Sequence, residues 1–278
     1  MPNQKVLFLD AYNLIHRARF GFVDGPYSIV YNFFRGVRPI IEQFKPDRVY
    51  FVLEGNPKHR SDLYQDYKAN RRENLSPQQL EDWENFKRQK RIIVDVVKHL
   101  PFQIAYHPDY ECDDIIAHLV THTHREDNSV VISNDTDFIQ LYNSDAQVVV
   151  FSPVKKEYLE PTEYNYVYWK ALVGDTADNI KGVPRIGKKT AQTILTSPET
   201  IKNWILANPE KAEIWERNVE LIKFADLNPT LDRLEIIKPD TNLEYVKEKF
   251  QEMNFSSITN DAAWLKFSKT FNSLVEGE

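Results

Sequence analysis

The sequence predicts an α/β fold in which helices cover both faces of a mainly parallel central sheet. The first observation is a set of five apolar, β-branched segments, at residues 5–10, 47–54, 102–107, 129–135 and 147–152. Segments of helical character lie between most of them, at residues 28–44, 76–99 and 112–125. Nearly continuous apolar strands that alternate with helices are typical of a parallel sheet buried on both sides.

The pattern changes after about residue 155, where the strand signals fade. Pro161 and Thr162 suit the start of a helix, and further helices are expected at residues 188–196, 199–207, 210–225 and 243–253. No low-complexity linker or internal repeat separates the two parts. We therefore predict an α/β core at residues 1–155 and a helical region at residues 156–278 that packs tightly against it.

The composition sets limits on the class of protein. The chain has 278 residues, of which 42% are apolar, and this is enough for a sizeable core. No apolar run reaches the length of about 18 residues that a membrane span needs. The N-terminus lacks a signal-peptide pattern, and the single cysteine, Cys112, cannot form an internal disulfide. We expect a reducing, cytoplasmic setting.

Acidic residues follow four of the predicted strands. Each acid alone has a simpler explanation, since carboxylates cap helices and occupy turns. The carboxyl ends of parallel strands meet at one edge of a sheet, however, and ligands bind there. We therefore predict that seven acids meet in one cleft: Asp10, Glu54, Glu111, Asp113, Asp114, Asp135 and Asp137.

A group of seven carboxylates predicts bound cations. Like charges a few ångströms apart cannot all stay ionised without compensation. Ligand sets made only of oxygen atoms favour Mg²⁺ or Mn²⁺, and seven acids are more than one octahedral ion needs. Two ions about 4 Å apart are the arrangement that serves phosphodiester cleavage. The sequence has no Gly-Lys phosphate loop, no Ser-His-Asp order and no zinc-type Cys/His spacing.

A glycine-rich stretch at residues 172–191, LVGDTADNIKGVPRIGKKTA, gives a second signal. Asp175 and Asp178 are candidates for further metal ligands from the helical region. Backbone N–H groups at the start of a helix bind phosphate without reading bases, and glycines allow a close approach. The predicted phosphate contacts are Gly182, Gly187, Lys188, Lys189 and Thr190. The alternative is an ordinary joint between two helices with glycine at its bends.

The net charge of −6 weakly opposes a nucleic-acid partner. Removing the nine candidate site acids from the 41 acidic residues leaves 32 acids against 35 Lys and Arg. The acidity is therefore concentrated where metal ions would neutralise it. The rest of the surface can carry basic patches that face DNA.

These motifs resemble those of the 5′ nuclease superfamily, which includes flap endonucleases, bacteriophage 5′–3′ exonucleases with RNase H activity and the nuclease domain of bacterial DNA polymerase I. The match runs in order over roughly residues 5 to 192. It rests on the segments LDAYNLIHRA, YKANR, YECDDIIA, SNDTDFIQL and GDTADNIKGVPRIGKKTA. The resemblance implies metal ligands at the nine acids named above. Glu54 stands where the family usually has Asp, and Cys112 stands where it usually has Ala.

The resemblance also implies roles for basic and aromatic residues. YKANR is similar to a family segment that supplies a lysine and an arginine near the scissile phosphate, so Lys68 and Arg71 are expected there. Residues 68–95 resemble the helical arch through which a single-stranded 5′ end passes. Cations that follow phosphates and aromatic rings that stack on bases suit that task. The expected DNA contacts are Arg17, Tyr67, Arg72, Lys87 and Arg88.

An amphipathic surface helix is the simpler alternative for the predicted helix at residues 76–99. In that case Trp83 and Phe86 would pack in the core instead of contacting DNA. The fold that the resemblance implies is a PIN-like 5′ nuclease core with an arch, followed by a helix-two-turn-helix at about residues 172–195.

The expected function is that of a structure-specific 5′ nuclease with two Mg²⁺ or Mn²⁺ ions, acting at 5′ flaps, 5′ ends and RNA primers on DNA in replication or repair. The family often holds K⁺ at the helix-two-turn-helix, so K⁺ is a further expected ion. We expect a monomer of phage type, working in the host cytoplasm on flap DNA or RNA/DNA hybrids beside replication proteins and away from membranes. The alternatives are a PIN-type single-strand ribonuclease and a DNA-junction binding protein that does not cut.

Overall fold

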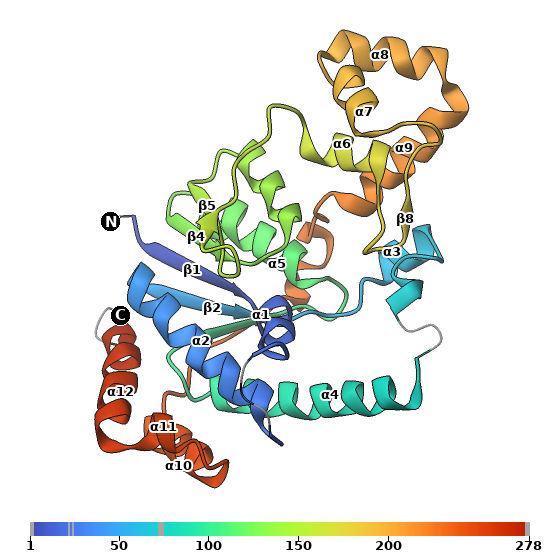
Figure 1. Ribbon diagram of the computed structural model, residues 1–278. Coiled ribbons are helices and arrows are strands. Elements are labelled where there is room, and N and C mark those ends of the chain that lie inside the picture. The colour runs from blue at the N-terminus through green and yellow to red at the C-terminus, as the bar shows by residue number, and fades with distance from the viewer. Residues whose placement is uncertain (1–2, 22, 24, 72–74, 276–278) are drawn as a thin grey trace.

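The structure is a computed structural model that describes residues 3–21, 23, 25–71 and 75–275. Its centre is a seven-stranded sheet with the strand order β6-β5-β4-β1-β2-β3-β9 (Figure 1). The five predicted strands are confirmed and run parallel to one another. They are β1 (Lys5–Asp10), β2 (Arg48–Val52), β3 (Gln103–Tyr106), β4 (Asn128–Ile132) and β5 (Val148–Ser152).

Strand β1 lies between β2 and β4, with Leu9 opposite Phe51 on one side and Ile132 on the other. The chain runs outward from β1 to β2 and β3, then crosses to build β4 and β5 on the other side. The strand order therefore reverses between β1 and β4. In open α/β sheets ligands bind at the carboxyl ends of the strands at this point, and Asp10 is the last residue of β1.

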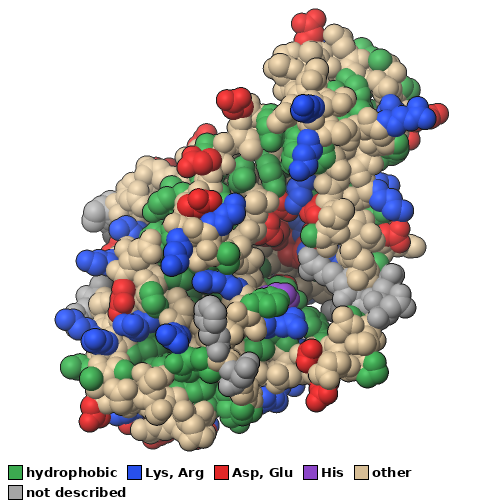
Figure 2. All heavy atoms as spheres, viewed as in Figure 1, with side chains coloured by type: hydrophobic (Ala, Val, Ile, Leu, Met, Phe, Trp, Pro, Cys, Tyr) green, Lys and Arg blue, Asp and Glu red, His purple; other side chains and the backbone are tan. Residues whose placement is uncertain are grey.

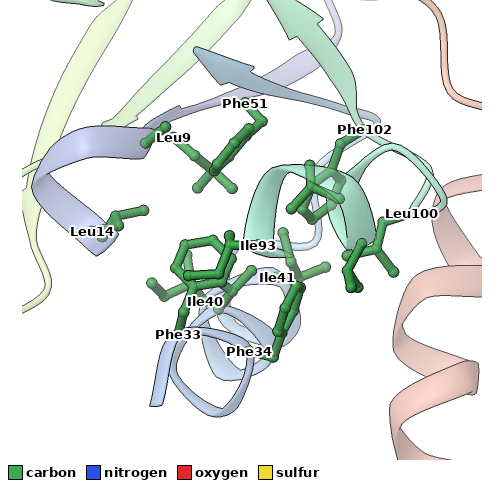
Figure 3. Close-up of a cluster of buried hydrophobic side chains, with 14 of the residues drawn as sticks. Leu9, Leu14, Phe33, Phe34, Ile40, Ile41, Phe51, Ile93, Leu100 and Phe102 are labelled. Atoms are coloured by element: carbon green, nitrogen blue, oxygen red, sulfur yellow. The ribbon is translucent and has the colours of Figure 1, made fainter. Parts of the chain in front are cut away.

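One face of the sheet is covered by α1 (Ala11–Ala18), α2 (Ser28–Phe44) and α4 (Pro77–Val97). Leu9 and Phe51 of the strands pack there against Phe34 of α2 and Ile93 of α4, all fully buried (Figure 3). Each such side chain stabilises the fold by roughly 2 kcal/mol.

Helix α4 begins where the sequence predicts. Ser76 accepts a hydrogen bond from the N–H of Gln79, and the Gln79 side chain accepts one from the N–H of Ser76. Pro77 follows as the first helical residue, where its missing N–H is not needed. This reciprocal cap fixes the start of the helix that the sequence assigns to the arch.

The opposite face is covered by α5 (Cys112–His118), the π-helical turn η2 (Leu119–Thr123) and the 3₁₀ helix η3 (Thr136–Asn143). Val6 and Phe8 point to this side, because neighbouring residues of a strand alternate between faces. Helices therefore cover both faces of the sheet, and the predicted fold class is confirmed.

A third core cluster belongs to the helical region at the upper right of Figure 1. The predicted helices at 188–196, 199–207 and 210–225 are confirmed. The elements are α6 (Tyr166–Val173), β7 (Gly174–Asp175), β8 (Ile180–Lys181), α7 (Lys188–Ile194), α8 (Pro198–Ala207) and α9 (Pro209–Ile222). The short strands β7 and β8 pair antiparallel between α6 and α7, where no strand was predicted.

The prediction that strands end near residue 155 is wrong. Two-residue β6 (Glu157–Tyr158) pairs with β5, and β9 (Glu235–Ile237) pairs antiparallel with β3. All three residues of β9 are exposed, so no alternation of buried and exposed side chains marks it in the sequence.

The C-terminal helices return to the sheet. They are α10 (Leu243–Glu252), which confirms the predicted helix at 243–253, α11 (Ser256–Thr259) and α12 (Asp261–Val275). Phe250 of α10 packs on Phe34 of α2. These C-terminal helices share a hydrophobic core with the sheet. The division of the chain into two regions at residue 155 therefore stays a prediction. Within the described residues, no helix combines the length and the apolar character needed to cross a bilayer.

Candidate active site

Asp10 and Asp135 are joined through one hydroxyl group at the ends of β1 and β4. Asp10 caps α1 by accepting the N–H of Asn13 at 3.1 Å, and its other oxygen accepts the Ser133 hydroxyl at 2.7 Å. The Ser133 oxygen accepts the N–H of Asp135 at 3.0 Å. Burial, with a smaller contribution from Asp135, raises the pKa of Asp10 to about 6. Asp10 is therefore a helix cap and also a buried acid at the strand ends.

Glu111, Asp113 and Asp114 gather at the start of α5. Within the described residues they form a group in which one carboxylate oxygen from each acid lies within 4.8 Å of the others. Burial and then repulsion from Asp114 and Glu111 raise the pKa of Asp113 well above its usual range. Oxygen donors this close together suit a hard divalent cation.

Arg60, in α3 (Lys58–Leu63), compensates part of this charge, and the sequence analysis missed it. Its guanidinium donates to both oxygens of Asp114, each at 2.6 Å, and to Glu111 at 2.7 Å. It also donates to the carbonyls of Leu221 and Lys223, at 3.0 and 3.2 Å, at the end of α9. Its only sequence signal is its place in the KHRSDLYQDYKANR segment.

Asp114 accepts hydrogen bonds from the protein, whereas a metal ligand needs a carboxylate oxygen that is open to the ion. Both of its oxygens accept from Arg60, and one of them also accepts the N–H of Ala225 at 2.8 Å. The side chain is fully buried. Asp114 therefore lies among the predicted acids, but protein donors occupy it.

Lys68 and Tyr67 contact the same group of acids from the arch side. The Lys68 ammonium pairs with Glu111 and lies 3.5 Å from Asp178. Its backbone has a left-handed φ of 56° and donates its N–H to the carbonyl of Asp178 at 3.0 Å. Although burial acts to raise it, Lys68 and Arg60 hold the pKa of Glu111 below its ordinary value.

The predicted role of Tyr67 in base stacking is contradicted by its position. The side chain is only 8% exposed and packs in the core of the helical region. Its hydroxyl donates to Glu111 at 2.7 Å and lies 3.4 Å from an Asp178 carboxylate oxygen. Tyr67 therefore orients two carboxylates, and its ring is not available to an unpaired base.

A second group combines Asp137, in η3 after β4, with Asp175 of β7. Lys170, also missed by the sequence analysis, pairs with Asp137 and lies 2.7 Å from Asp175. Burial, and then repulsion from Asp135, raises the pKa of Asp137 to about 7. Although burial acts to raise it, Lys170 keeps the pKa of Asp175 below its usual range. Figure 2 shows acidic side chains in a hollow at the centre of this face, with Lys and Arg around it.

Comparison with known proteins identifies this arrangement. Residues 5–169 match the family model described as 5′-3′ exonuclease, N-terminal resolvase-like domain, and residues 161–259 match the one described as 5′-3′ exonuclease, C-terminal SAM fold. The chain belongs to the 5′–3′ exonuclease family. The predicted membership of the 5′ nuclease superfamily is confirmed, and with it the function of a 5′ nuclease that hydrolyses phosphodiester bonds.

Individual relatives agree with this assignment. The 5′-3′ exonuclease of Aquifex aeolicus is 30% identical over 260 residues, which cover 85% of each chain. The thermostable DNA polymerase I of Thermus filiformis is 31% identical over 261 residues, which cover 87% of this chain and 30% of the polymerase. This 5′ nuclease therefore spans under a third of the polymerase.

Solved structures share the fold. The T5 D15 protein co-crystallised with metal ions has a TM-score of 0.67 at 17% identity, and 99% of each chain is covered. Flap endonuclease-1 from Methanococcus jannaschii has a TM-score of 0.62 at 14% identity, with 99% of this chain and 94% of that chain covered.

Glu54 lies at the edge of the 5′ nuclease site. Its carboxylate is 31% exposed and lies 3.4 Å from the Lys90 ammonium of α4. Burial raises the pKa of the neighbouring Cys112 thiol, and the charges of Asp10, Asp113 and Glu54 add to this effect. Glu54 is therefore close enough to act on the site electrostatically, although its contact is with the arch helix.

The predicted arch cations already have protein partners. Lys87 pairs with Glu84 at 2.7 Å, and Arg88 donates to the carbonyl of Pro26 and to Asn85. Phe86 is 1% exposed and stacks on Trp83, with ring centroids 5.3 Å apart. The simpler reading, core packing, is therefore confirmed for Phe86.

The other expected DNA contacts fall into three classes. Arg17 is half-buried, and burial lowers its pKa. Arg72 and the side chain of Arg71 lie outside the described part of the chain. Gly187, Lys188, Lys189 and Thr190 are exposed at the start of α7.

Gly182 has a structural reason of its own. A Cβ atom there would lie 2.4 Å from the carbonyl oxygen of Val173. Only glycine allows the two backbones to pass this closely. Gly182 is therefore needed for the close approach of the chain after β8 to the end of α6, and this reason is independent of DNA binding.

Proposed function

We propose that this 5′ nuclease cuts DNA at 5′ flaps and 5′ ends with two Mg²⁺ or Mn²⁺ ions held by the acids at the strand ends. The observation that carries the proposal is the gathering of acids at the strand ends, where Glu111, Asp113 and Asp114 place carboxylate oxygens within 4.8 Å of one another and the Ser133 hydroxyl links Asp10 to the backbone of Asp135. Buried carboxylates this close together resist ionisation until cations compensate them. The divalent cations that a nuclease of this kind binds as its cofactor would compensate the charge of these carboxylates.

The residues fit such ions. All donors are oxygen atoms, and they fall into two sets that would each hold one ion. One set is Glu111, Asp113 and Asp178, and the other is Asp135, Asp137 and Asp175. Asp10 lies between the two sets. The charge of Asp135, in one set, raises the pKa of Asp10, and Asp10 and Asp113 of the other set both raise the pKa of Cys112. We assign Glu54 to an outer position, and Asp114 to holding Arg60 beside the ligands.

When bound, divalent ions would supply Lewis-acid stabilisation of the phosphate and a water of lowered pKa. Lys68 is held at the same carboxylates by its left-handed backbone and its bond to the Asp178 carbonyl. Its ammonium can donate to a phosphoryl oxygen and stabilise the charge that develops there. We assign Arg71 the same task.

The start of α7 would hold the duplex by its phosphates. Lys188 and Lys189 are exposed there, next to Gly187, where an added Cβ would meet nothing within 4 Å. Contacts of this kind position a duplex without reading its sequence. The substrate would therefore be chosen by structure, and K⁺ bound by the backbone near this turn belongs to the proposal.

The substrates and setting follow from the relatives. The matched proteins include 5′-3′ exonucleases, polymerase I enzymes and a T5 flap endonuclease complex with DNA and metal ions. They support a role in replication or repair. We extend the proposal to RNA primers on DNA, and to a monomer that works in the cytoplasm beside replication proteins.

One assay tests the proposal. A 5′-flap duplex labelled at the flap is incubated with Mg²⁺, with EDTA, and with the Asp135→Asn variant. Cutting near the junction that needs the metal and Asp135 is the expected result. Binding without cutting would favour a junction-binding protein, and cutting of single-stranded RNA alone would favour the PIN-type ribonuclease. Titration with Mn²⁺ should give two bound ions.

A further inference from the structure

A pocket of ≈ 590 Å³ lies between α2 and the C-terminal helices α11 and α12. Phe34, Ile258 and Phe267 form its buried floor, and the apolar surface open to a ligand comes mainly from Tyr31, Ala262 and Ala263. Both phenylalanines contact Phe250 of α10, with ring centroids 5.0 and 5.5 Å apart. The floor is therefore part of the hydrophobic core and fixed in shape. A pocket of this size accepts one or two bulky side chains or a small ligand.

The rim of the pocket is cationic. It carries Arg35, Arg38 and Lys266, and among the described residues no Asp or Glu lines the pocket. Arg38 pairs with Glu42 outside the lining, at 2.6 Å. Arg35 lies 6.0 Å from the Tyr31 ring, and both Arg35 and Lys266 are exposed. In a chain whose net charge is −6, this concentration of positive charge around an apolar floor selects a ligand that is anionic and apolar at once.

The pocket is separate from the nuclease machinery. One of its walls, α12, lies outside both segments that match the family models, residues 5–169 and 161–259. In Figure 1 the helices α10 to α12 lie at the lower left, away from the helical region that contains α7. Figure 2 shows Lys and Arg side chains beside a hydrophobic area there. None of the residues proposed to bind metal or DNA lines it.

We propose that this pocket is a docking site for an acidic peptide of a partner protein. A bulky apolar side chain of the peptide would fill the pocket against Tyr31 and Ala263, and its carboxylates would pair with Arg35 and Lys266. An anchor in a preformed pocket with charges at its rim is how short peptides gain both affinity and rapid association. Duplex nucleic acid supplies the negative charge, but its bases are paired and stacked, so it offers no free apolar group to the pocket. The pocket would tether the nuclease to its partner while the active site stays open.

Fluorescence anisotropy tests the docking site with defined peptides. The probe is a fluorescein-labelled peptide with three aspartates followed by Leu and Phe. Two control peptides replace the aspartates by Asn or the Leu and Phe by Ala. The protein variants are Arg35→Glu with Lys266→Glu, and a charge-matched control, Lys188→Glu with Lys189→Glu.

The acidic, apolar peptide should bind saturably, and each control peptide about tenfold more weakly. The Arg35→Glu, Lys266→Glu variant should lose about tenfold in peptide affinity and keep its flap-cutting rate within about twofold. The Lys188→Glu, Lys189→Glu variant should keep its affinity for the peptide. Equal affinities for all peptides, no saturable binding, or unchanged binding by the Arg35→Glu, Lys266→Glu variant would overturn the proposal. Displacement of the peptide by unlabelled duplex DNA would assign the surface to nucleic acid instead.

Discussion

The guanidinium of Arg60 donates to both carboxylate oxygens of Asp114 at 2.6 Å, and these side chains are 2% and 0% exposed. The same guanidinium donates to two carbonyls at the end of α9. One buried cation therefore joins the start of α5, which carries three of the acids, to the helical region. Removing a single partner of such a pair leaves a buried charge uncompensated.

Arg60→Met should lower the free energy of unfolding by about 3–5 kcal/mol. The matched control is Arg125→Met, because Arg125 also pairs with an aspartate at 2.7 Å but is 53% exposed. That exposed pair should contribute at most about 1 kcal/mol. Urea denaturation of the two variants gives the comparison. Equal losses would show that burial does not set the energy of the Arg60 pair.

Lys170→Met should make folding depend more strongly on divalent ions. Lys170 lies between Asp137 and Asp175, and all three side chains are 12% exposed. Without the ammonium these carboxylates repel each other, so the melting temperature in EDTA should fall, and saturating Mn²⁺ should restore most of it.

Lys155→Met is the control for Lys170, since Lys155 is 59% exposed and lies 3.7 Å from Glu157. Differential scanning fluorimetry with and without Mn²⁺ makes the measurement. If Mn²⁺ raises the melting temperature equally in Lys170→Met and wild type, the two carboxylates near Lys170 do not hold an ion.

The stability of the metal-free protein should fall as the pH rises from about 4.5 to about 7.5. The pKa of Asp10 is raised to about 6 and that of Asp137 to about 7, both from 3.8. In this window these two acids bind more protons in the folded state than in the unfolded state, so their contribution to stability is lost as pH rises through the folded pKa values. At about 1.4 kcal/mol for each pKa unit, this contribution corresponds to roughly 3 kcal/mol for Asp10 and roughly 4 kcal/mol for Asp137. Burial lowers the pKa of His59, His118 and His124, which gives a smaller slope in the opposite direction.

Urea titrations in EDTA at several pH values measure the slope. The double variant Asp10→Asn, Asp137→Asn should flatten it, and saturating Mn²⁺ should do the same, because bound cations favour the ionised acids. Below about pH 4 the lowered pKa values of Glu111 and Asp175 work in the opposite direction. Equal pH slopes in the metal-free wild type and the metal-free double variant would contradict the assignment.

Lys68→Ala should lower the single-turnover cutting rate by about 10²-fold and change flap affinity only a few-fold. Its ammonium lies at Glu111 and Asp178, where the phosphate is expected, so it should act mainly on the transition state. Lys58→Ala is the control, because Lys58 is 72% exposed and pairs with its helical neighbour Asp62. A large loss of affinity with an unchanged rate would make Lys68 a binding residue.

The sequence predicts those features that depend on local pattern or on strand direction. The five central strands and α4 follow from apolar periodicity and the Ser76 cap. The acids gather because parallel strands end at one edge of the sheet. Arg60 and Lys170 could not be predicted, since their roles arise from contacts with residues 54 and 33 positions away. The role of Tyr67 was predicted wrongly, because the amino-acid sequence does not show which way its ring faces.

Substitutions of the two glycines that precede α7 test folding and DNA binding separately. At Gly182 an added Cβ would lie 2.4 Å from the Val173 carbonyl oxygen, which is backbone and cannot move away. At Gly187 an added Cβ meets nothing within 4 Å, and φ is an ordinary −94°. Gly182→Ala should therefore shift the β7–β8 crossing and lower stability by about 2 kcal/mol or more. Gly187→Ala should fold with the stability of wild type.

The affinity for duplex DNA then tests whether phosphate approaches the start of α7. If the backbone at Gly187 contacts a phosphate, the methyl group of Gly187→Ala should weaken duplex binding about tenfold in a protein of unchanged melting temperature. Filter binding with blunt duplex in EDTA avoids cutting during the measurement. Gly36→Ala is the control, because Gly36 lies in α2 and an added Cβ there also meets nothing within 4 Å. Equal DNA affinity in Gly187→Ala and Gly36→Ala would remove Gly187 from the phosphate contacts and leave Lys188 and Lys189 to act through their side chains alone.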